Sequence, residues 1–210
     1  MSRMTMGAAA AGAGLIALAA GSARGDTFND LASFEGATEN LVLLNFDVDE
    51  NGRAFNLFDQ IGDRYGTLGI HFPAGNYTAG GNGAPSLPNG WFNDTTPDGG
   101  ISRVFDAEFT ASDVTAVGVY QLLAAGGGGT SLVAFDAQGG VLGSVSGDND
   151  VDTVDFFGLT TTSPISRIEV TFTNPGGWGL DNLYFGQQVP APSAGVALCG
   201  GLLLAGRRRR

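Results

Sequence analysis

The sequence contains no lysine, one histidine and one cysteine, and these scarcities limit its chemistry. With Cys199 as the only cysteine, the chain can form neither an internal disulfide nor a multi-thiolate metal site. His71 is the only histidine, so a multi-histidine zinc site is excluded and a Ser–His–Asp arrangement would depend on this one residue. No other motif supports such an arrangement, and we expect a protein that is not an enzyme.

Basic residues are also scarce outside the two ends. Between residues 26 and 186, four arginines stand against all 21 acidic residues of the chain, whose overall formal charge is −11. Such an acidic surface repels nucleic acid and anionic lipid, which argues against either as a partner. It suits cations or a saline environment, although solubility alone would also explain it.

Residues 1–25 have the pattern of a signal peptide. Arg3 supplies a positive start, residues 8–20 are apolar apart from glycine, and small residues around Ala23 fit a signal peptidase. The apolar run is short for a transmembrane helix, which needs about 20 apolar residues. The alternative is an N-terminal helix of the core. We expect the segment to be removed on export.

The C-terminal end has three parts in a fixed order. A proline-containing motif, an apolar stretch over residues 194–206 and an arginine cluster follow one another. The motif and cluster residues are Val189, Pro190, Ala191, Pro192, Arg207, Arg208, Arg209 and Arg210. The apolar stretch spans about 20 Å as a helix, against roughly 30 Å of membrane core, and becomes long enough only when counted from Val189.

This tripartite end resembles the PEP-CTERM sorting signal, with Ala191 where the name-giving motif has glutamate. The resemblance implies that an exosortase-like membrane protease cuts near the motif, after signal peptidase has acted at the other end. It also implies a cell-surface or extracellular location, with transient anchoring by the C-terminal apolar helix. A plain C-terminal membrane anchor is the alternative.

The region between the two ends, residues 26–186, has the pattern of one all-β domain. Short β-rich runs recur, with glycine-rich turns between them and no convincing amphipathic helix. The expected strands cover residues 41–46, 68–72, 101–109, 114–123, 132–135, 141–145, 165–173 and 179–185, with a hairpin turn at 136–140. Many short strands of this kind predict a jelly-roll-like β-sandwich. The runs at 65–72, at 156–158 followed by 165–170, and at 179–186 resemble the β-sandwich ectodomains that accompany this sorting signal.

Two acidic segments are candidate calcium ligands. Residues 47–52 match the opening of a calcium loop, but Phe58 stands where an EF-hand needs glutamate, which excludes an EF-hand. A jelly-roll calcium site would instead combine Asp47, Asp49 and Asn51 with a late-strand carboxylate such as Asp181. The oxygen-rich segment 148–152 is a second candidate. The alternative in both places is an acidic surface loop.

Residues 73–100 form the longest stretch without strand character, and long loops in compact domains are often functional. Tyr77, Trp91 and Phe92 lie in it among asparagines and glycines, and Trp178 could join them. Aromatic faces beside amide and carboxylate groups are typical of sugar-binding surfaces. The alternative is that these rings cap the core.

Together these features predict a non-catalytic exported protein of the cell surface or extracellular matrix that binds polysaccharide. One alternative is a purely structural, calcium-binding matrix component. A secreted hydrolase is the least favoured, because no pair of carboxylates stands out from the many acids.

Overall fold

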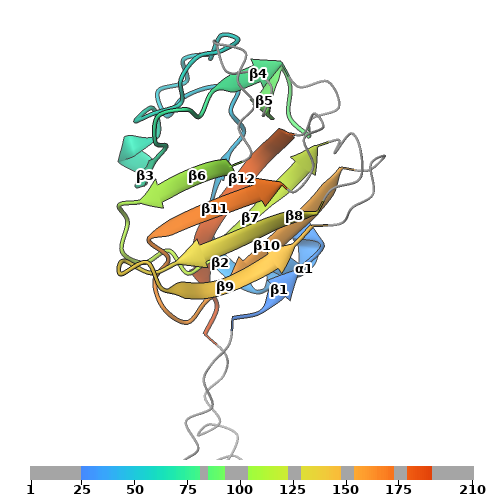
Figure 1. The fold of residues 1–210 in the computed structure, drawn as a ribbon, viewed down its shortest axis with the longest axis vertical. Helices are drawn as coiled ribbons and strands as arrows, with labels where there is room; N and C mark the ends of the chain where they lie inside the picture. Colours follow the sequence, from blue (N-terminus) through green and yellow to red (C-terminus); the bar gives the residue numbers. More distant parts are fainter. Residues whose placement is uncertain are drawn as a thin grey trace, which may run out of the picture.

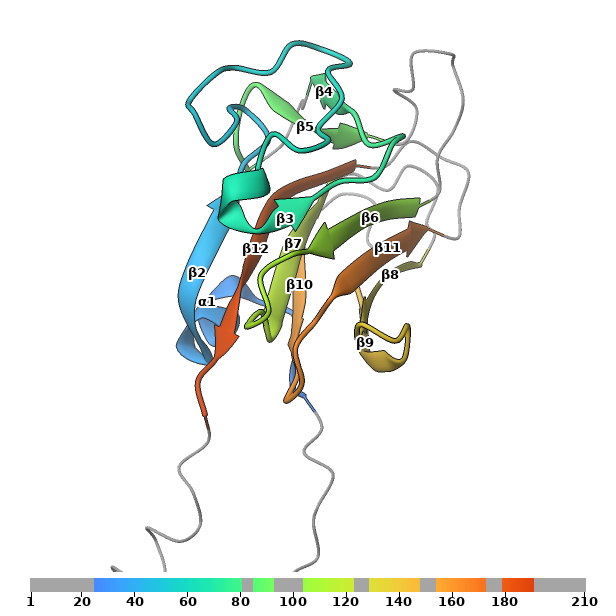
Figure 2. The same cartoon turned by 90° about the vertical axis from the view of Figure 1, so that its left-hand side faces the viewer.

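The computed structural model of the chain describes residues 25–80, 85–92, 104–122, 129–147, 154–172 and 179–190. They form a sandwich of two antiparallel sheets with a layer of loops across one end (Figures 1 and 2). The predicted signal peptide, the C-terminal apolar helix and the 148–152 segment lie outside the described residues.

One sheet has seven strands. Its order is β1-β10-β7-β12-β5-β4, and β2 lies beside β12. The strands are β1 (Thr27–Phe28), β10 (Asp155–Thr160), β7 (Ala116–Leu122), β12 (Gly179–Gln188), β5 (Asn89–Phe92), β4 (Thr78–Gly80) and β2 (Thr38–Leu44). Within it β12 is the longest strand and pairs with β7, β5 and β2.

The other sheet has five strands in the order β3-β6-β11-β8-β9. They are β3 (Ile70–His71), β6 (Val104–Phe109), β11 (Arg167–Phe172), β8 (Thr130–Phe135) and β9 (Val141–Ser146). Along β11 buried and half-buried residues alternate without exception, as the sequence pattern predicted.

Successive strands repeatedly cross from one sheet to the other. The chain passes from β6 to β7, from β9 to β10, from β10 to β11 and from β11 to β12 across the sandwich. Only β8 and β9 form a simple hairpin within the five-stranded sheet, at the predicted turn. The jelly-roll-like β-sandwich is therefore confirmed.

The core lies between the two sheets. Phe105, Leu132 and Ile168 from one sheet pack with Phe157 and Leu183 from the other. All five residues are completely buried. Removing this apolar surface from water is the main favourable contribution to folding. No cysteine takes part, so packing and hydrogen bonds stabilise the described domain.

A six-residue helix, α1 (Leu31–Gly36), was not predicted, and the expectation of no helix after residue 26 is wrong at this point. It begins after Asp30, whose carboxylate accepts a 2.8 Å hydrogen bond from the amide of Ser33. The helix buries Phe34 completely against the outer side of the seven-stranded sheet. Gly158 of β10 makes room for it, because an added Cβ would lie 3.0 Å from the Phe34 ring. Six residues are too few to show a helical period.

Three short elements differ from what the sequence pattern predicted for their residues. A 3₁₀ helix, η1 (Gly66–Leu68), takes up the start of the strand expected at 68–72. Both β4 and β5 lie in the stretch predicted to lack strands. Glycine and asparagine in these two strands obscure the usual alternation, which is why they were missed.

The first and last described residues lie at the same end of the sandwich. Figures 1 and 2 show the start of β1 and the end of β12 at the bottom, while β4 and β5 lie at the top. The strand β12 continues to Gln188, and the amide of Val189 donates a 2.9 Å hydrogen bond to the carbonyl of Ala37. Among the described residues, no helix is long and apolar enough to cross a membrane.

Candidate functional site

The loops at the top of the sandwich rest on a cluster of aromatic side chains. Phe46 lies with its ring centroid 6.4 Å from that of Tyr65 and 6.0 Å from that of Phe72, and Phe72 lies 5.6 Å from Phe105 of the five-stranded sheet. Most of these contacts are edge-on or tilted, the arrangement that aromatic pairs prefer. Phe46 adopts a positive φ of 58°, which is strained for a bulky residue and is held in place by this packing.

The Tyr65 hydroxyl joins this cluster to the acidic loop. It donates a 2.7 Å hydrogen bond to the carbonyl of Val48, next to Asp47. Burial raises the pKa of Tyr65, so the hydroxyl keeps its proton and remains a donor. The loop that carries Asp47 is therefore attached to the core beneath it.

Asp181, in the first half of β12, has a completely buried carboxylate. It accepts hydrogen bonds from the Ser86 amide at 2.8 Å, from the Ser86 hydroxyl at 2.9 Å and from the Asn182 amide at 2.8 Å. Its pKa is raised to about 6, chiefly by burial; the hydrogen bonds from Ser86 and Asn182 lower the pKa, and the nearby charge of Asp47 raises it. A buried carboxylate of this kind is costly unless its partners stay in place.

Asp47 holds the same segment at Asn89, further along the chain than Ser86. Its carboxylate accepts a 2.8 Å hydrogen bond from the amide of Asn89, the first residue of β5. The Asn89 side chain in turn donates to the carbonyl of Phe55, at 3.4 Å. Ser86 also contacts the carbonyl of Asn45, at 2.9 Å. Two carboxylates from distant parts of the chain thus hold residues 86–89 against the end of the sheet.

The segment before β4 is held in a similar way. The Asn76 side chain donates to the carbonyl of Pro73 at 2.9 Å and to the carboxylate of Asp106 at 3.0 Å. Thr78 is fully buried, and its hydroxyl donates to the carbonyl of Asn56 at 2.8 Å. Tyr77 lies between these two anchored residues and is half-buried.

The structure brings three of the four aromatic candidates to this end of the molecule. Backbone pairing places Trp91 opposite both Thr78 of β4 and Leu180 of β12, and Phe92 opposite Gly179. Tyr77 directly precedes β4. Trp178 lies outside the described residues. The grouping of Tyr77, Trp91 and Phe92 along adjacent strands follows from β4 and β5, which the sequence pattern did not reveal.

The calcium candidates are placed as follows. Asp47 and Asp181 lie near enough for the charge of one to act on the other. Asp49 turns away into its own loop, where its carboxylate accepts 2.9 Å hydrogen bonds from the amides of Asn51 and Arg53. In the described part of the chain, no three acidic, histidine or cysteine side chains gather as a metal site would require.

A polar surface that sequence reasoning missed covers the outer face of the five-stranded sheet. Strand register arranges its side chains in three rows that run across the strands. The rows are His71, Glu108, Arg167, Phe135 and Val141; then Asp106, Glu169, Val133 and Ser144; and finally Val104, Thr171, Ser131 and Ser146. The alternation along β11 was visible in the sequence, but only the register shows which residues of other strands stand beside it.

Arg167 is the organising side chain of this outer face. Its guanidinium carbon lies 4.0 Å from the centroid of the Phe135 ring, and its Nη1 lies 3.1 Å from Glu169 Oε1. Ser131 and Thr171 share a 2.8 Å hydrogen bond in the neighbouring row, and His71 contacts Asp63 at the edge. The face offers a guanidinium, carboxylates and hydroxyl groups for hydrogen bonding, and the carboxylates outnumber the one arginine.

Comparisons with known proteins give a distant structural likeness. No family model and no curated protein matches the chain. Among solved structures, a family 29 carbohydrate-binding module is 11% identical and has a TM-score of 0.36; the match covers 70% of this chain and 90% of that one. A family 43 arabinoxylan arabinofuranohydrolase from Bacillus subtilis, in complex with cellotetraose, is 12% identical with a TM-score of 0.39, over 70% of this chain and 33% of that one. A likeness at this level carries no argument about a ligand or a site.

The buried Asp181 predicts an unusual pH dependence of stability. The pKa of Asp181 is about 6 in the folded protein, against an ordinary value of 3.8 that we take for the unfolded chain. The folded state therefore binds the proton more tightly. The free energy of unfolding should therefore fall by about 3 kcal/mol, relative to the Asp181→Asn variant, as pH rises from about 4 to about 7. Urea unfolding of both proteins across this range measures the difference. Parallel pH profiles would contradict the assignment.

The calcium site stays a prediction, and thermal melting tests it. If Asp47 and Asp181 share a calcium ion, the melting temperature should rise in calcium and fall in chelator, because a ligand that binds only the folded state stabilises it. The Asp47→Asn variant should lose that response. An unchanged midpoint in wild type would remove the hypothesis.

Proposed function

We propose that this chain is a non-catalytic protein of the cell surface or extracellular matrix that binds a neutral polysaccharide through the β4–β5 end of its sandwich. The observation that carries the proposal is the anchoring of residues 86–89 by Asp181 and Asp47. Burying a carboxylate to hold a surface segment adds no apolar packing to the core. The buried carboxylate is explained if a ligand requires that segment in a fixed position.

Anchoring favours binding because it lowers the entropy lost when a ligand arrives. The segments around Tyr77 and before β5 are held by side-chain hydrogen bonds from Asn76, Thr78 and Ser86. A surface that is already ordered keeps more of its contact energy as affinity. Trp91 and Phe92 follow one another on β5, the strand that this anchoring holds.

The charge of the domain indicates the class of polysaccharide. Acidic side chains predominate over the whole chain and on the outer face, where Asp106, Glu108 and Glu169 surround Arg167. Polymers rich in uronic acid would be repelled by such a field. Neutral glycans would not, and their hydroxyls can donate to carboxylates.

The position of this end supports the proposal. It lies opposite the start of β1 and the end of β12, the two places where the chain leaves the sandwich (Figure 1). A protein held to a surface by a C-terminal tail would thus present β4 and β5 outward. The tail itself belongs to the export proposal, which rests on the sequence pattern alone.

Binding is tested with affinity electrophoresis and titration calorimetry of the full chain against neutral glucans, xylans and mannans, with polygalacturonate for comparison. We expect retention by at least one neutral polymer and none by polygalacturonate. Tyr77→Ala should weaken binding at least tenfold, since an aromatic ring that packs on a ligand is worth on the order of 1–3 kcal/mol. Trp91→Ala and Phe92→Ala are measured in parallel, and melting curves report whether each variant folds.

Ser112→Ala serves as the control for that series, because Ser112 is exposed and lies just before β7, whose first residue pairs with Gly186 near the end of β12, away from the site. Its affinity should equal that of wild type. Absence of binding to every polymer, or loss of binding in the control as well, would overturn the proposal.

Export and sorting are tested by intact-mass measurement of the protein recovered from its native host. We expect the N-terminal 23–25 residues to be absent, and the chain to end close to Pro190 or Pro192 if an exosortase-like protease acts. A mature chain that retains Arg207, Arg208, Arg209 and Arg210 would refute cleavage of the tail and favour a plain anchor.

A further inference from the structure

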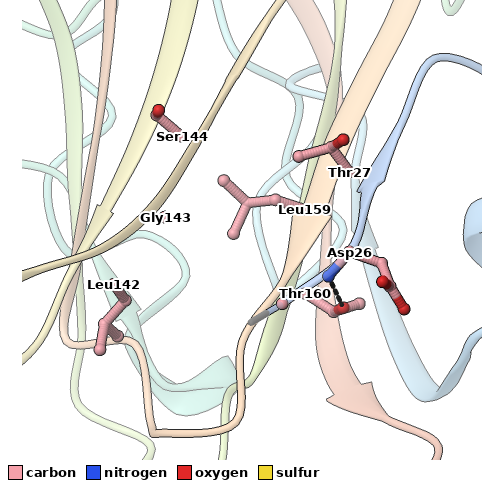
Figure 3. Close-up of a pocket in the computed structure, with 8 residues that line it drawn as sticks. Asp26, Thr27, Leu142, Gly143, Ser144, Leu159 and Thr160 are labelled. Atoms are coloured by element: carbon pink, nitrogen blue, oxygen red, sulfur yellow. Dashed lines mark hydrogen bonds between the residues drawn. The ribbon is translucent and has the colours of Figure 1, made fainter. Parts of the chain in front are cut away.

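Along the edge of the sandwich where β9 faces β10, the two sheets first stand apart and then meet. Beside the middle of β9 a cleft of about 450 Å³ separates Ser144 from Leu159 of β10 (Figure 3). Just past the end of β9 the gap closes at Gly147. A Cβ added there would lie 2.8 Å from Gln121 Oε1 and 3.0 Å from the Phe157 ring. The side chain of Gln121, which belongs to the seven-stranded sheet, therefore reaches across to the five-stranded sheet.

Thr130, the first residue of β8, lies at the same place. Ser131 pairs with Ser146. One residue further, the amide of Gly147 donates a 3.0 Å hydrogen bond to the carbonyl of Thr130, so these two residues stand opposite one another. Opposite residues in a strand pair hold their Cβ positions about 4.5–5.5 Å apart. Buried and half-buried residues alternate along β8, and Thr130 is one of the buried ones. Its hydroxyl and the Gln121 carboxamide are therefore neighbours in the interior.

Both side chains carry polar atoms without a hydrogen-bond partner. Gln121 is completely buried and Thr130 is 1% exposed. In the part of the chain that the structure describes, five buried side-chain atoms lack a partner, and three of them are Gln121 Oε1, Gln121 Nε2 and Thr130 Oγ1. A buried polar atom of this kind has lost its hydration and gained nothing in return, so native proteins hold few of them. Three such atoms at one place require an explanation.

We propose that Thr130 and Gln121 react with one another to form an ester that links the two sheets. The Thr130 Oγ1 forms a bond to Gln121 Cδ, and the bond from Cδ to Nε2 breaks. The hydroxyl proton moves to Nε2, which leaves as ammonia, so the step needs neither an oxidant nor a reductant. The product contains neither the unpaired hydroxyl nor the unpaired amide N–H groups, which accounts for their burial.

Asp155 is placed to carry the proton. It stands directly opposite Gln121 in the β7–β10 pair, and opposite residues of a strand pair present their side chains on the same face. Its carboxylate takes the proton from Thr130 Oγ1 and delivers it to the departing nitrogen, as a general base and then a general acid. Because Gln121 and Thr130 have almost no surface open to solvent, water that would hydrolyse the ester is excluded.

Such a link gives the domain a covalent constraint in the absence of a disulfide. It joins β7 to β8, which belong to different sheets, and a cross-link stabilises the folded state by restricting the unfolded chain. The link is independent of the proposed polysaccharide site, so either proposal can fail without the other.

Intact-mass measurement of the purified, folded full chain tests the link. We expect a mass lower than that calculated from the sequence by one ammonia, about 17 Da. Fragmentation of the ion should give no products of backbone breaks between residues 121 and 130. Thr130→Val should have the full calculated mass. Ser131→Ala is the matched control, because it removes the neighbouring hydroxyl, which bonds Thr171 on the outer face, and it should keep the deficit.

Thermal melting of the same proteins separates a cross-link from a bare buried hydroxyl. If the link forms, Thr130→Val loses it and melts several degrees lower than wild type. Without a link, removing an unpaired hydroxyl leaves the melting temperature unchanged or raises it. A wild-type chain of full mass would overturn the proposal. So would a deficit that persists in Thr130→Val, since the ammonia would then come from another residue.

The role of Asp155 has its own measurement. After synthesis, Asp155→Asn should acquire the mass deficit at least tenfold more slowly than wild type, because the amide cannot accept the proton. An equal rate in the two proteins would refute the part assigned to Asp155.

Discussion

The buried carboxylate of Asp181 is the constraint on which the β4–β5 end of the molecule depends. It lies on β12, the strand that pairs with β2, β5 and β7, and it takes hydrogen bonds from both the amide and the hydroxyl of Ser86. A buried ionised carboxylate without such donors would cost several kcal/mol. The position of Ser86, and through it the start of β5, therefore follows from the need to satisfy one oxygen-rich group inside the protein.

The two sheets and the loop layer are stabilised by different forces. Between the sheets, apolar side chains such as Phe105, Phe157 and Ile168 are simply removed from water. At the β4–β5 end, an aromatic cluster around Phe46 supports irregular backbone whose polar groups are bound by side chains. The regular part of the sandwich can tolerate changes of apolar side chain that conserve volume. The loop layer cannot tolerate loss of a hydrogen-bonding partner so easily, because each partner serves a specific buried group.

Predictability differed between the regular and irregular parts. The strands corresponding to β7, β8, β9, β11 and β12 and the turn at 136–140 were predicted, because alternating apolar residues and glycine-rich turns depend on local sequence. Both β4 and β5 were missed, since their stability comes from β12 and from Asp47, not from strand propensity. Asp47 and Asp181 were singled out together as calcium ligands. The structure does bring them close, but it also shows hydrogen bonds to Asn89 and Ser86 that no spacing rule could reveal.

The sequence by itself determined the class of the domain, its acidic character and the absence of any disulfide, because these depend on composition and on short-range periodicity. Its two ends also predict export and sorting, because such signals are linear patterns. Only the tertiary structure decided which residues meet: the rows across the outer face, and the anchoring of Tyr77 and of β5. Strand order and register arise from contacts between residues far apart in the chain, such as Ser86 and Asp181, and a local pattern contains no information about such contacts.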